Sequence, residues 1–559
     1  MAARTSPVDR AAREARHRLG ISLTAVQRRA VSSVLAGRDT LVVSPTGSGK
    51  SAVYQLTGAM TDGITVIVSP LIALQEDQLA NLRRLDLGDA VVISSLRGAP
   101  ARTSALARLG DPGVQFVLLG PEQLARQDVR LALRARRIDR LVVDEAHCVD
   151  LWGPDLRPDY LALGAVRRDL GSPPVLAVTA TAPPFVRTEI ADVLGMEQPV
   201  EIVAPAERRN IELAVVRHGT RDALEEAIVE EAAGRSGTGL IYVGRRRDAE
   251  ALARRLDKPQ RPALAYHGSL PAADRRTVHR DFRRRDVVVV ATSAFGLGID
   301  APEVRFVLHT DAPETVDAYV QEIGRAGRDG EPAVATLHVV GGRASRRRFA
   351  AGRSVPDVDL CAAVAAISRP TPLTELRRTL GASDGRTLQA IRLLEPLGVV
   401  RLTADMVVEP GDRDLSRSTA HVQAHLEQRA TLLRTRRHMV DWYADGDGCR
   451  WAALTAYLEA AEIGACGHCD VCRRSGHRRR PAPRHGGRRR VTHPEFGEGA
   501  VVNDDDDEVT VLFDTAGFRT LSKQLLTDPT AGATLRDAPD PTAGTPQLRS
   551  RHREGPPPV

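Results

Sequence analysis

The sequence has very little lysine, few aromatic residues and few cysteines, and it contains no long apolar run. Without about 18 consecutive apolar residues it offers no membrane-spanning helix, and we expect no membrane partner. The N-terminal segment lacks the apolar region of a secretory signal. Six cysteines in 559 residues are too few for a disulfide scaffold. These absences exclude a porin, a small secreted module, a coiled coil and a collagen.

The composition instead fits a chain of several folded domains. At roughly 150 residues per domain, 559 residues predict three or four domains, and 42% hydrophobic residues suffice to bury their cores. The net charge of +7 and the pI near 9.3 are compatible with a polyanionic partner, although an arginine excess can equally keep a surface soluble. Only three lysines stand beside 75 arginines, so a position that keeps lysine is informative.

Short β-branched runs alternate with helix-forming stretches through the first 340 residues. Buried strands separated by helices are typical of a parallel, doubly wound sheet, so we expect an α/β fold with two such domains. The stretch 201–218 is expected to join them. The runs are 41–44, 64–69, 114–119, 141–144 and 175–181 in the first domain, and 239–243, 264–268, 287–292, 304–309 and 335–340 in the second.

The C-terminal part has a different pattern. Residues 356–402 give a helix, a glycine-containing turn, a second helix and a β-branched exit, which predicts a helix-turn-helix or winged helix, with a plain helical connector as the alternative. Residues 476–490 are arginine-rich without acids and predict a disordered basic linker. A small β-rich unit with an acidic hairpin turn at 503–508 follows, and the tail from about 529 is expected to be disordered.

A phosphate-binding loop is predicted at SPTGSGKS (44–51), between a strand and a helix. Its glycines allow backbone N–H groups to point inward, Lys50 can neutralise the β- and γ-phosphates, and Ser51 can bind Mg²⁺. Arginine is a poor substitute at this position because its planar fork is wider than the site. Ser44 departs from the strict pattern, which has glycine there. The expected phosphate ligands are Thr46, Gly47, Ser48, Gly49, Lys50 and Ser51.

Two further blocks carry charges that suit phosphoryl transfer. The LVVDEAH segment ends a strand with Asp144 and Glu145, and we expect Asp144 to hold Mg²⁺ through water and Glu145 to activate the attacking water. Alone, this block is compatible with an ordinary loop. In QEIGRAGRDG (321–330), Arg325 and Arg328 lie three residues apart, and both are predicted to reach the γ-phosphate across a cleft.

These three blocks resemble motifs I, II and VI of superfamily 2 helicases, and residues 15–340 resemble the RecQ family of DNA helicases. The stretch DEAHCVDLWGPDLRPDYLALG (144–164) is the most specific to that family. The resemblance implies that Gln27 reads adenine and that Gln321 lies at the nucleotide, although Leu23-Thr24 replaces the usual Phe-Arg pair of the adenine motif. It also implies contact with DNA, or coupling of DNA to ATP hydrolysis, for Ser69, Trp152, Arg157, Thr179 and Thr292.

Four of the six cysteines have the spacing of a metal site. Cys449 is followed, after sixteen residues, by CGHCDVC with Cys466, Cys469 and Cys472, which supplies four thiolates for one tetrahedral ion in a reducing cytosol. A closed four-thiolate site is structural, and the resemblance favours zinc over an iron–sulfur cluster. His468 is a possible substitute ligand, and Cys148 and Cys361 are expected to be packed thiols.

The resemblance gives the whole chain an expected organisation. The family usually places a winged helix after its zinc module, whereas here the candidate precedes it. Residues 491–526 resemble the Tudor/SH3-like module of UvrD/PcrA helicases; a plain β-barrel cap is the alternative. The expected units are two tandem RecA-like domains (1–205, which binds ATP, and 206–345), a winged-helix candidate (346–415), a zinc module (416–475), a basic linker (476–490), the Tudor/SH3-like module (491–528) and a tail (529–559).

The sequence therefore predicts a cytosolic ATP-dependent helicase of the bacterial nucleoid that travels 3′→5′ on single-stranded DNA and unwinds tailed duplexes in recombination and repair. Its cofactors would be ATP, Mg²⁺ and Zn²⁺, and 491–528 would contact RNA polymerase or a repair protein. One alternative is an RNA helicase of the same superfamily. The other is a non-enzymatic DNA-binding or transcription-linked adaptor.

Overall fold

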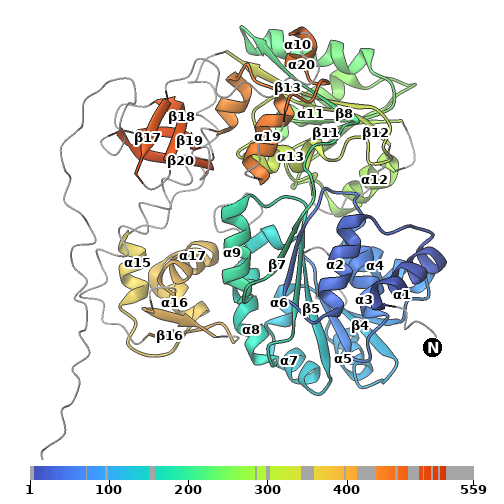
Figure 1. Cartoon of the computed structure of the whole chain (residues 1–559), viewed down its shortest axis with the longest axis vertical. Coiled ribbons are helices and arrows are strands. Elements are labelled where there is room, and N and C mark those ends of the chain that lie inside the picture. The colour runs from blue at the N-terminus through green and yellow to red at the C-terminus, as the bar shows by residue number, and fades with distance from the viewer. Residues whose placement is uncertain are drawn as a thin grey trace, which may run out of the picture.

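Two α/β domains lie one above the other in the computed structural model, with smaller units at their sides (Figure 1). No helix among the described residues combines the length and apolarity needed to cross a bilayer. The structure describes residues 6–70, 72–94, 98–149, 158–283, 286–296, 303–341, 358–395, 398–403, 405–411, 436, 439–459, 464–475, 490–494, 497–504, 508–513 and 517–523.

The first domain is a seven-stranded parallel sheet in the order β3-β4-β2-β5-β6-β1-β7. Its strands are nearly continuous runs of Val, Ile and Leu because helices cover both faces. The strands are β1 (Thr40–Val43), β2 (Ile64–Val68), β3 (Asp89–Ile93), β4 (Val114–Leu119), β5 (Ile138–Asp144), β6 (Val175–Thr179) and β7 (Val200–Val203). One face is covered by α1 (Pro7–Glu14), α2 (Ala25–Leu35), α3 (Lys50–Gly58) and α4 (Ile72–Arg84), and the other by α5 (Gly98–Arg108), α6 (Pro121–Leu124), α7 (Gln127–Arg134), α8 (Leu163–Asp169) and α9 (Pro184–Leu194).

The second domain is a six-stranded parallel sheet in the order β10-β11-β9-β12-β13-β8. Its strands are β8 (Ile211–His218), β9 (Thr238–Tyr242), β10 (Ala263–Tyr266), β11 (Val288–Ala291), β12 (Val304–His309) and β13 (Ala333–Val340). Helices α10 (Arg221–Gly234) and α11 (Arg246–Leu256) cover one face, and α12 (Ala272–Phe282), α13 (Val316–Ile323) and α19 (Arg450–Glu459) cover the other. The predicted pair of parallel-sheet domains is confirmed.

The stretch 201–218, predicted to join the two domains, contains their connection but also strand residues on either side of it. This stretch supplies an edge strand to each sheet: β7 pairs with β1, and β8 pairs with β13. Both strands mix charged and apolar residues, because an edge strand has one neighbour and a more exposed face. Neither strand therefore shows the continuous apolar run that is typical of a central strand. Strand β3, another edge strand, was also not predicted. The connection between the sheets is the short segment 204–210.

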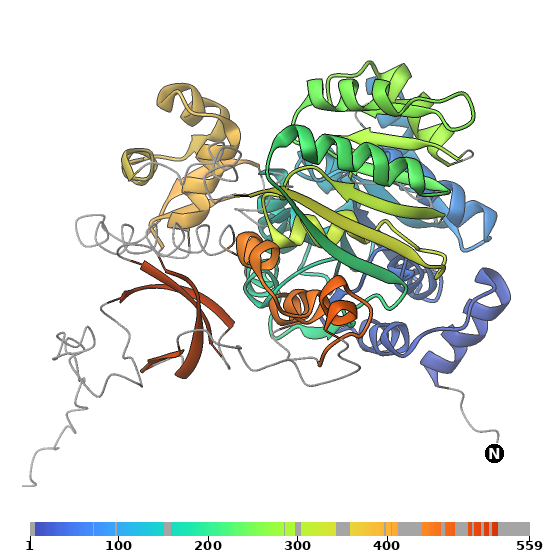
Figure 2. The same cartoon turned by 90° about the horizontal axis from the view of Figure 1, so that it is seen from above.

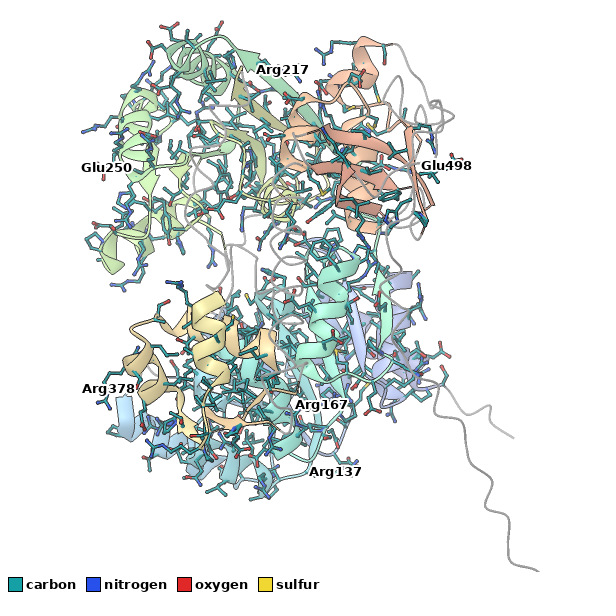
Figure 3. All side chains as sticks on the ribbon, turned by 90° about the vertical axis from the view of Figure 1, so that its left-hand side faces the viewer. Arg137, Arg167, Arg217, Glu250, Arg378 and Glu498 are labelled. Atoms are coloured by element: carbon teal, nitrogen blue, oxygen red, sulfur yellow. The ribbon has the colours of Figure 1, made fainter. Side chains whose placement is uncertain are left out.

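A helix-turn-helix unit with a three-stranded antiparallel sheet precedes the cysteine cluster, as predicted for a winged helix. It packs on the first domain, with Leu360 and Val364 in the same apolar core as Val166, and Asp405 pairs with Arg130. Arg378 lies on its outer surface (Figure 3). Its elements are α15 (Val358–Ala365), β14 (Thr371–Pro372), α16 (Leu373–Leu380), α17 (Asp384–Leu394), β15 (Val400–Leu402) and β16 (Val407–Pro410).

The helices around the cysteine cluster and the small C-terminal sheet lie beside the second domain. The helix-turn-helix unit lies at a different place (Figure 2). Helix α19 and the short α20 (Asp470–Arg474) pack on β8, where the buried indole of Trp451 donates a hydrogen bond to the Ile211 carbonyl at 3.1 Å. A four-stranded antiparallel sheet follows, and its β18 and β19 form a hairpin around the predicted acidic turn, of which 505–507 lie outside the described residues. Most of the predicted basic linker and the tail from 529 also lie outside them. The strands are β17 (Arg490–His493), β18 (Gly497–Asp504), β19 (Glu508–Phe513) and β20 (Gly517–Ser522).

Candidate active site and metal centre

The predicted phosphate-binding loop lies between β1 and α3 at the carboxyl end of the first sheet. Gly47 and Gly49 have φ values of 81° and 75°, a left-handed conformation that other residues rarely adopt. Gly49 caps α3, which begins at Lys50, so the positive end of the helix faces the loop. A Cβ atom on Gly47 would lie 3.4 Å from the Arg328 side chain of the second domain. The loop therefore has the backbone of a phosphate cradle, and a residue of the other domain lies against it.

Lys50 lies half-buried among charges of both signs. Its Nζ donates hydrogen bonds to the carbonyls of Ser44 at 2.8 Å and Pro45 at 3.3 Å. Burial lowers the pKa of Lys50, the charges of Glu145 and Asp144 oppose this, and Arg328 adds to the lowering. The charges of both carboxylates and of Arg328 thus all influence the Lys50 ammonium, which lies between the two sheets.

The two carboxylates occupy the end of β5. Burial and the charge of Glu145 raise the pKa of Asp144 to about 6, although Lys50, the Glu145 N–H and Gln78 lower it. Glu145 has a φ of 51°, a left-handed conformation that costs free energy for a residue with a Cβ. Its buried Oε2 accepts no hydrogen bond from the described residues. A half-buried, ionisable pair with an unused acceptor suits a hydrated divalent cation next to a phosphate.

Two further residues bind Asp144: Gln78, which the sequence analysis did not single out, and Tyr160, which belongs to the family-specific stretch 144–164. Gln78 of α4 donates from Nε2 to Asp144 Oδ2 at 3.1 Å and to the Tyr54 hydroxyl at 2.9 Å. The Tyr160 hydroxyl donates to the Asp144 carbonyl at 3.0 Å. The sequence gives no local signal for the Gln78 contact, because Gln78 and Asp144 lie 66 residues apart.

His147 links this site to the next strand. Its Nδ1 lies 2.9 Å from Thr179 Oγ1 and 3.4 Å from Glu145 Oε2. The Thr179 hydroxyl donates to the Thr181 carbonyl at 3.1 Å, and Thr179 is fully buried. The end of β6 is therefore tied through one imidazole to the carboxylate at the end of β5.

The two predicted arginines have different surroundings. Arg328 lies against Gly47 of the loop. Arg325 is buried inside the second domain near Tyr242, whose hydroxyl donates to the Phe295 carbonyl at 2.8 Å; burial raises the pKa of Tyr242 to about 12, and Arg325 opposes this. The structure thus brings one of the two arginines to the phosphate-binding loop and turns the other toward its own sheet.

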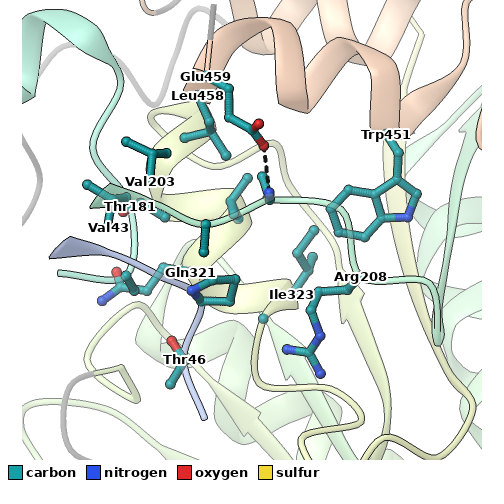
Figure 4. A pocket seen from close by; sticks show the side chains of 16 residues that line it. Val43, Thr46, Thr181, Val203, Arg208, Gln321, Ile323, Trp451, Leu458 and Glu459 are labelled. Atoms are coloured by element: carbon teal, nitrogen blue, oxygen red, sulfur yellow. Dashed lines mark hydrogen bonds between the residues drawn. The ribbon is translucent and has the colours of Figure 1, made fainter. Parts of the chain in front are cut away.

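The other predicted nucleotide ligands surround the loop. Gln27 completes a reciprocal cap with Thr24, and its Nε2 donates to the carbonyls of Ser48 at 3.0 Å and Gly49 at 3.2 Å. Ser51 hydrogen-bonds Tyr54. Thr46 and Gln321 line a pocket between the domains (Figure 4).

The predicted DNA-side residues are placed in part. Ser69 is fully buried at the end of β2, where its carbonyl accepts a hydrogen bond from Gln75 Nε2 at 3.0 Å. Thr292 is half-buried at the end of β11. Trp152 and Arg157 lie outside the described residues. The sulfur cluster, by contrast, is described in full.

The sulfur atoms of the four predicted metal-binding cysteines, Cys449, Cys466, Cys469 and Cys472, lie within 4.8 Å of one another. The Cys466 and Cys472 sulfurs are 3.9 Å apart, close to the roughly 3.8 Å edge of a tetrahedron with Zn–S bonds of about 2.3 Å. Hydrogen bonding within the cluster lowers the pKa of Cys469, whereas the pKa values of Cys449 and Cys466 are raised, so a single thiolate is shared among neighbouring thiols. The predicted substitute ligand, His468, turns its Nδ1 toward the Cys466 carbonyl at 3.0 Å. These four sulfurs fit one tetrahedral ion.

Backbone amides support this cluster. The N–H of Cys466 donates to the Cys449 sulfur at 3.2 Å, and that of Arg450 donates to the Cys469 sulfur at 3.5 Å. Such bonds orient thiolate ligands and compensate their charge. Both predicted packed thiols, Cys148 and Cys361, are fully buried elsewhere.

Comparisons with known proteins agree with this arrangement. The DEAD/DEAH box helicase family matches residues 24–188, and the helicase conserved C-terminal domain matches 220–330. The probable ATP-dependent DNA helicase RecS of Bacillus subtilis is 32% identical over 472 residues, which cover 82% of this chain and 92% of RecS. The ATP-dependent DNA helicase RecQ of Synechocystis is 38% identical over 55% of this chain and 66% of that protein.

Longer relatives and solved structures extend the comparison. The RecQ-like DNA helicase blm-1 of Caenorhabditis elegans is 37% identical over 55% of this chain, but the match spans only 32% of blm-1. The solved structure of the DUF1998 helicase MrfA bound to DNA aligns with a TM-score of 0.51 and 18% identity over 73% of this chain and 60% of that one. At this identity the structural likeness concerns the fold alone.

The environment of Asp144 predicts a pH dependence of nucleotide hydrolysis. A pKa of about 6 means that the Asp144 carboxylate, the predicted Mg²⁺ ligand, becomes protonated as the pH falls through about 6. At subsaturating Mg²⁺ we therefore expect the hydrolysis rate to fall on the acid side near pH 6. Because a cation favours the ionised form, this limb should move to lower pH as Mg²⁺ is raised. An acid limb that stays fixed at every Mg²⁺ concentration would contradict this role of Asp144.

Proposed function

The chain belongs to the RecQ family of ATP-dependent DNA helicases, and on that premise we propose that it couples ATP hydrolysis to 3′→5′ movement along single-stranded DNA. This movement would unwind tailed duplexes during recombination and repair in the bacterial cytosol. The single observation that carries the proposal is the contact between Arg328 of the second domain and Gly47 of the phosphate-binding loop, beside Lys50 and the two carboxylates.

The residues of this cleft receive separate proposed roles. Lys50 and the loop N–H groups would hold the β- and γ-phosphates, with Ser51 and Asp144 toward Mg²⁺, which supplies charge neutralisation on the phosphates. Glu145 would orient and deprotonate the attacking water, consistent with its unused buried oxygen. Gln27 would read adenine, which requires its side-chain amide to exchange a present hydrogen bond for one to the base.

The arginines fit a cycle of domain closure. We propose that Arg328 contacts the γ-phosphate, since it already lies at the loop. Arg325 would join it when the domains close and it leaves the Tyr242 hydroxyl. A cationic group at the transferred phosphate is worth roughly 10³–10⁵ in rate in related phosphoryl transfers.

Coupling to DNA is proposed for the strand ends beside the carboxylates. Ser69 and Thr179 are fully buried, which supports a coupling role for their side chains over direct contact with DNA. Thr179 reaches Glu145 through His147. Thr292, Trp152 and Arg157 are proposed as contacts with the DNA. Binding through phosphates would be nearly independent of sequence and would weaken with salt.

We further propose that Zn²⁺ occupies the four-cysteine cluster as a structural ion. It would crosslink the start of α19 to α20, and both helices cover the second domain at β8. The cluster would therefore stabilise that domain and take no part in hydrolysis. Residues 491–528 are proposed to contact RNA polymerase or a repair protein. The support for this proposal is that β17 to β20 form a sheet of their own, which offers a separate surface.

Unwinding of tailed duplexes tests the proposed direction and mechanism together. We expect the wild-type chain to unwind a 3′-tailed duplex with ATP and to leave a 5′-tailed duplex intact. Because Lys50 supplies the cation at the phosphates, Lys50→Ala should abolish unwinding and reduce DNA-stimulated phosphate release by at least about 10³-fold. Release of phosphate is measured with single-stranded DNA and RNA of the same sequence.

The chain offers a matched control, because Lys258 is an exposed lysine on the second domain. Lys258→Ala should retain both activities. Unwinding of the 5′-tailed substrate alone would reverse the proposed direction, and equal stimulation by RNA would favour an RNA helicase. Unchanged phosphate release in Lys50→Ala would reject the proposed site.

Metal analysis tests the sulfur cluster. We expect one zinc ion per chain, lost in Cys469→Ser because three thiolates no longer close the tetrahedron. The variant should also lower the melting temperature of the second domain. Cys361→Ala, which removes a buried thiol outside the cluster, should keep the full zinc content. Iron and acid-labile sulfide in place of zinc would contradict the assignment.

A further inference from the structure

Helix α4 joins three parts of the molecule through residues within four positions of one another. Gln75 donates from Nε2 to the Ser69 carbonyl at 3.0 Å. Asp77 pairs with Arg283 at the end of α12, in the second domain, at 3.2 Å. Gln78 reaches the carboxylate of Asp144. One helix therefore contacts the end of β2, the other domain and the proposed Mg²⁺ carboxylate.

The Gln78 side chain is fixed in one orientation. It is 7% exposed, and its Nε2 makes both available hydrogen bonds, to Asp144 Oδ2 at 3.1 Å and to the Tyr54 hydroxyl at 2.9 Å. An amide carries two donor hydrogens on nitrogen and none on oxygen. A flipped amide would place its oxygen against a carboxylate, so only the observed orientation is attractive.

The geometry therefore assigns Gln78 as a positioning residue for Asp144: it holds the carboxylate in the orientation that binds the Mg²⁺ of the nucleotide. This inference deepens the proposed function and rests on it, because Asp144 must be the carboxylate that serves Mg²⁺. Partners of this kind orient metal-binding groups, and their removal typically costs about 10–100-fold in metal affinity or activity.

The position of Gln78 on α4 also couples Asp144 to Ser69, one of the residues proposed to respond to DNA. Gln75, three residues earlier on the same helix, holds the backbone of Ser69, and Asp77 pairs with the second domain. The Asp77–Arg283 pair is about half exposed and therefore weak and sensitive to salt. A shift of α4 on DNA binding or domain closure would move the Gln78 amide relative to Asp144. We infer that stimulation of hydrolysis by DNA passes in part through this contact.

Nucleotide binding with and without Mg²⁺ tests the positioning role directly. Affinity of the full chain for a fluorescent, non-hydrolysable ATP analogue is measured in Mg²⁺ and in EDTA for wild type and Gln78→Leu. Because Leu cannot donate, the affinity in Mg²⁺ should fall by about tenfold while the affinity in EDTA stays at the wild-type value. A purely structural role of Gln78 would lower both affinities together. Asn81→Ala, an exposed amide one turn further along α4, should match wild type in both conditions.

Hydrolysis measurements complete the test. In Gln78→Leu, kcat should fall, KM for ATP should rise in line with the lower affinity in Mg²⁺, and the ratio of DNA-stimulated to basal rate should drop. Gln78→Met, which fills a core position without a donor, gives the same readouts if the Leu variant fails to fold. Wild-type affinity in Mg²⁺ in a folded variant would overturn the positioning role, and an unchanged stimulation ratio would overturn the route through α4. If Lys50→Ala also hydrolyses ATP normally, the proposed function itself has failed, whatever the Gln78 variants do.

Discussion

The interaction on which the rest of the structure depends is the meeting of opposite charges between the two parallel sheets. Lys50 and Arg328 approach Asp144 and Glu145 at a partly buried point where no single domain supplies the full set. Burial makes these charges costly, and mutual pairing together with a bound triphosphate and cation offsets that cost. The ends of β1 and β5 deliver one half of the set, and the turn after α13 delivers the other. The balance of charge between the two domains therefore depends on the charge of the ligand bound in this cleft.

The accessory units are divided between the two domains. The helix-turn-helix unit shares the core of the first domain, whereas α19 and the cysteine cluster belong to the core of the second. Two contacts of α19 lie where the two domains meet. The Glu459 carboxylate accepts a hydrogen bond from the Ala206 N–H at 2.6 Å (Figure 4). The Tyr457 ring packs edge-on against Phe185 of α9, with 6.3 Å between the ring centroids. Relative motion of the domains would therefore move the helix-turn-helix unit against the cysteine cluster.

The sequence predicted the central features because they are local. The phosphate-binding loop, the carboxylate pair after a strand and the CxxC spacing each lie within a few residues, so their chemistry is visible without a fold. Contacts between distant segments were not visible: Gln78 and Asp144 lie 66 residues apart, and Arg325 and Arg328 differ in surroundings although they are three residues apart. The edge strands β7 and β8 were missed because their exposed faces carry charges. The packing of the helix-turn-helix unit on the first domain likewise depends on Arg130 and Asp405, 275 residues apart.

The central claim is that the two domains close around nucleotide, and the distance between them measures this most directly. Spin labels at Arg137→Cys in the first domain and Arg247→Cys in the second occupy side chains that are 76% and 75% exposed. With a non-hydrolysable ATP analogue, Mg²⁺ and single-stranded DNA, the distance distribution should narrow and shift to a new mean, and Arg328→Ala should prevent the shift. A distribution that is the same with and without nucleotide would contradict the account.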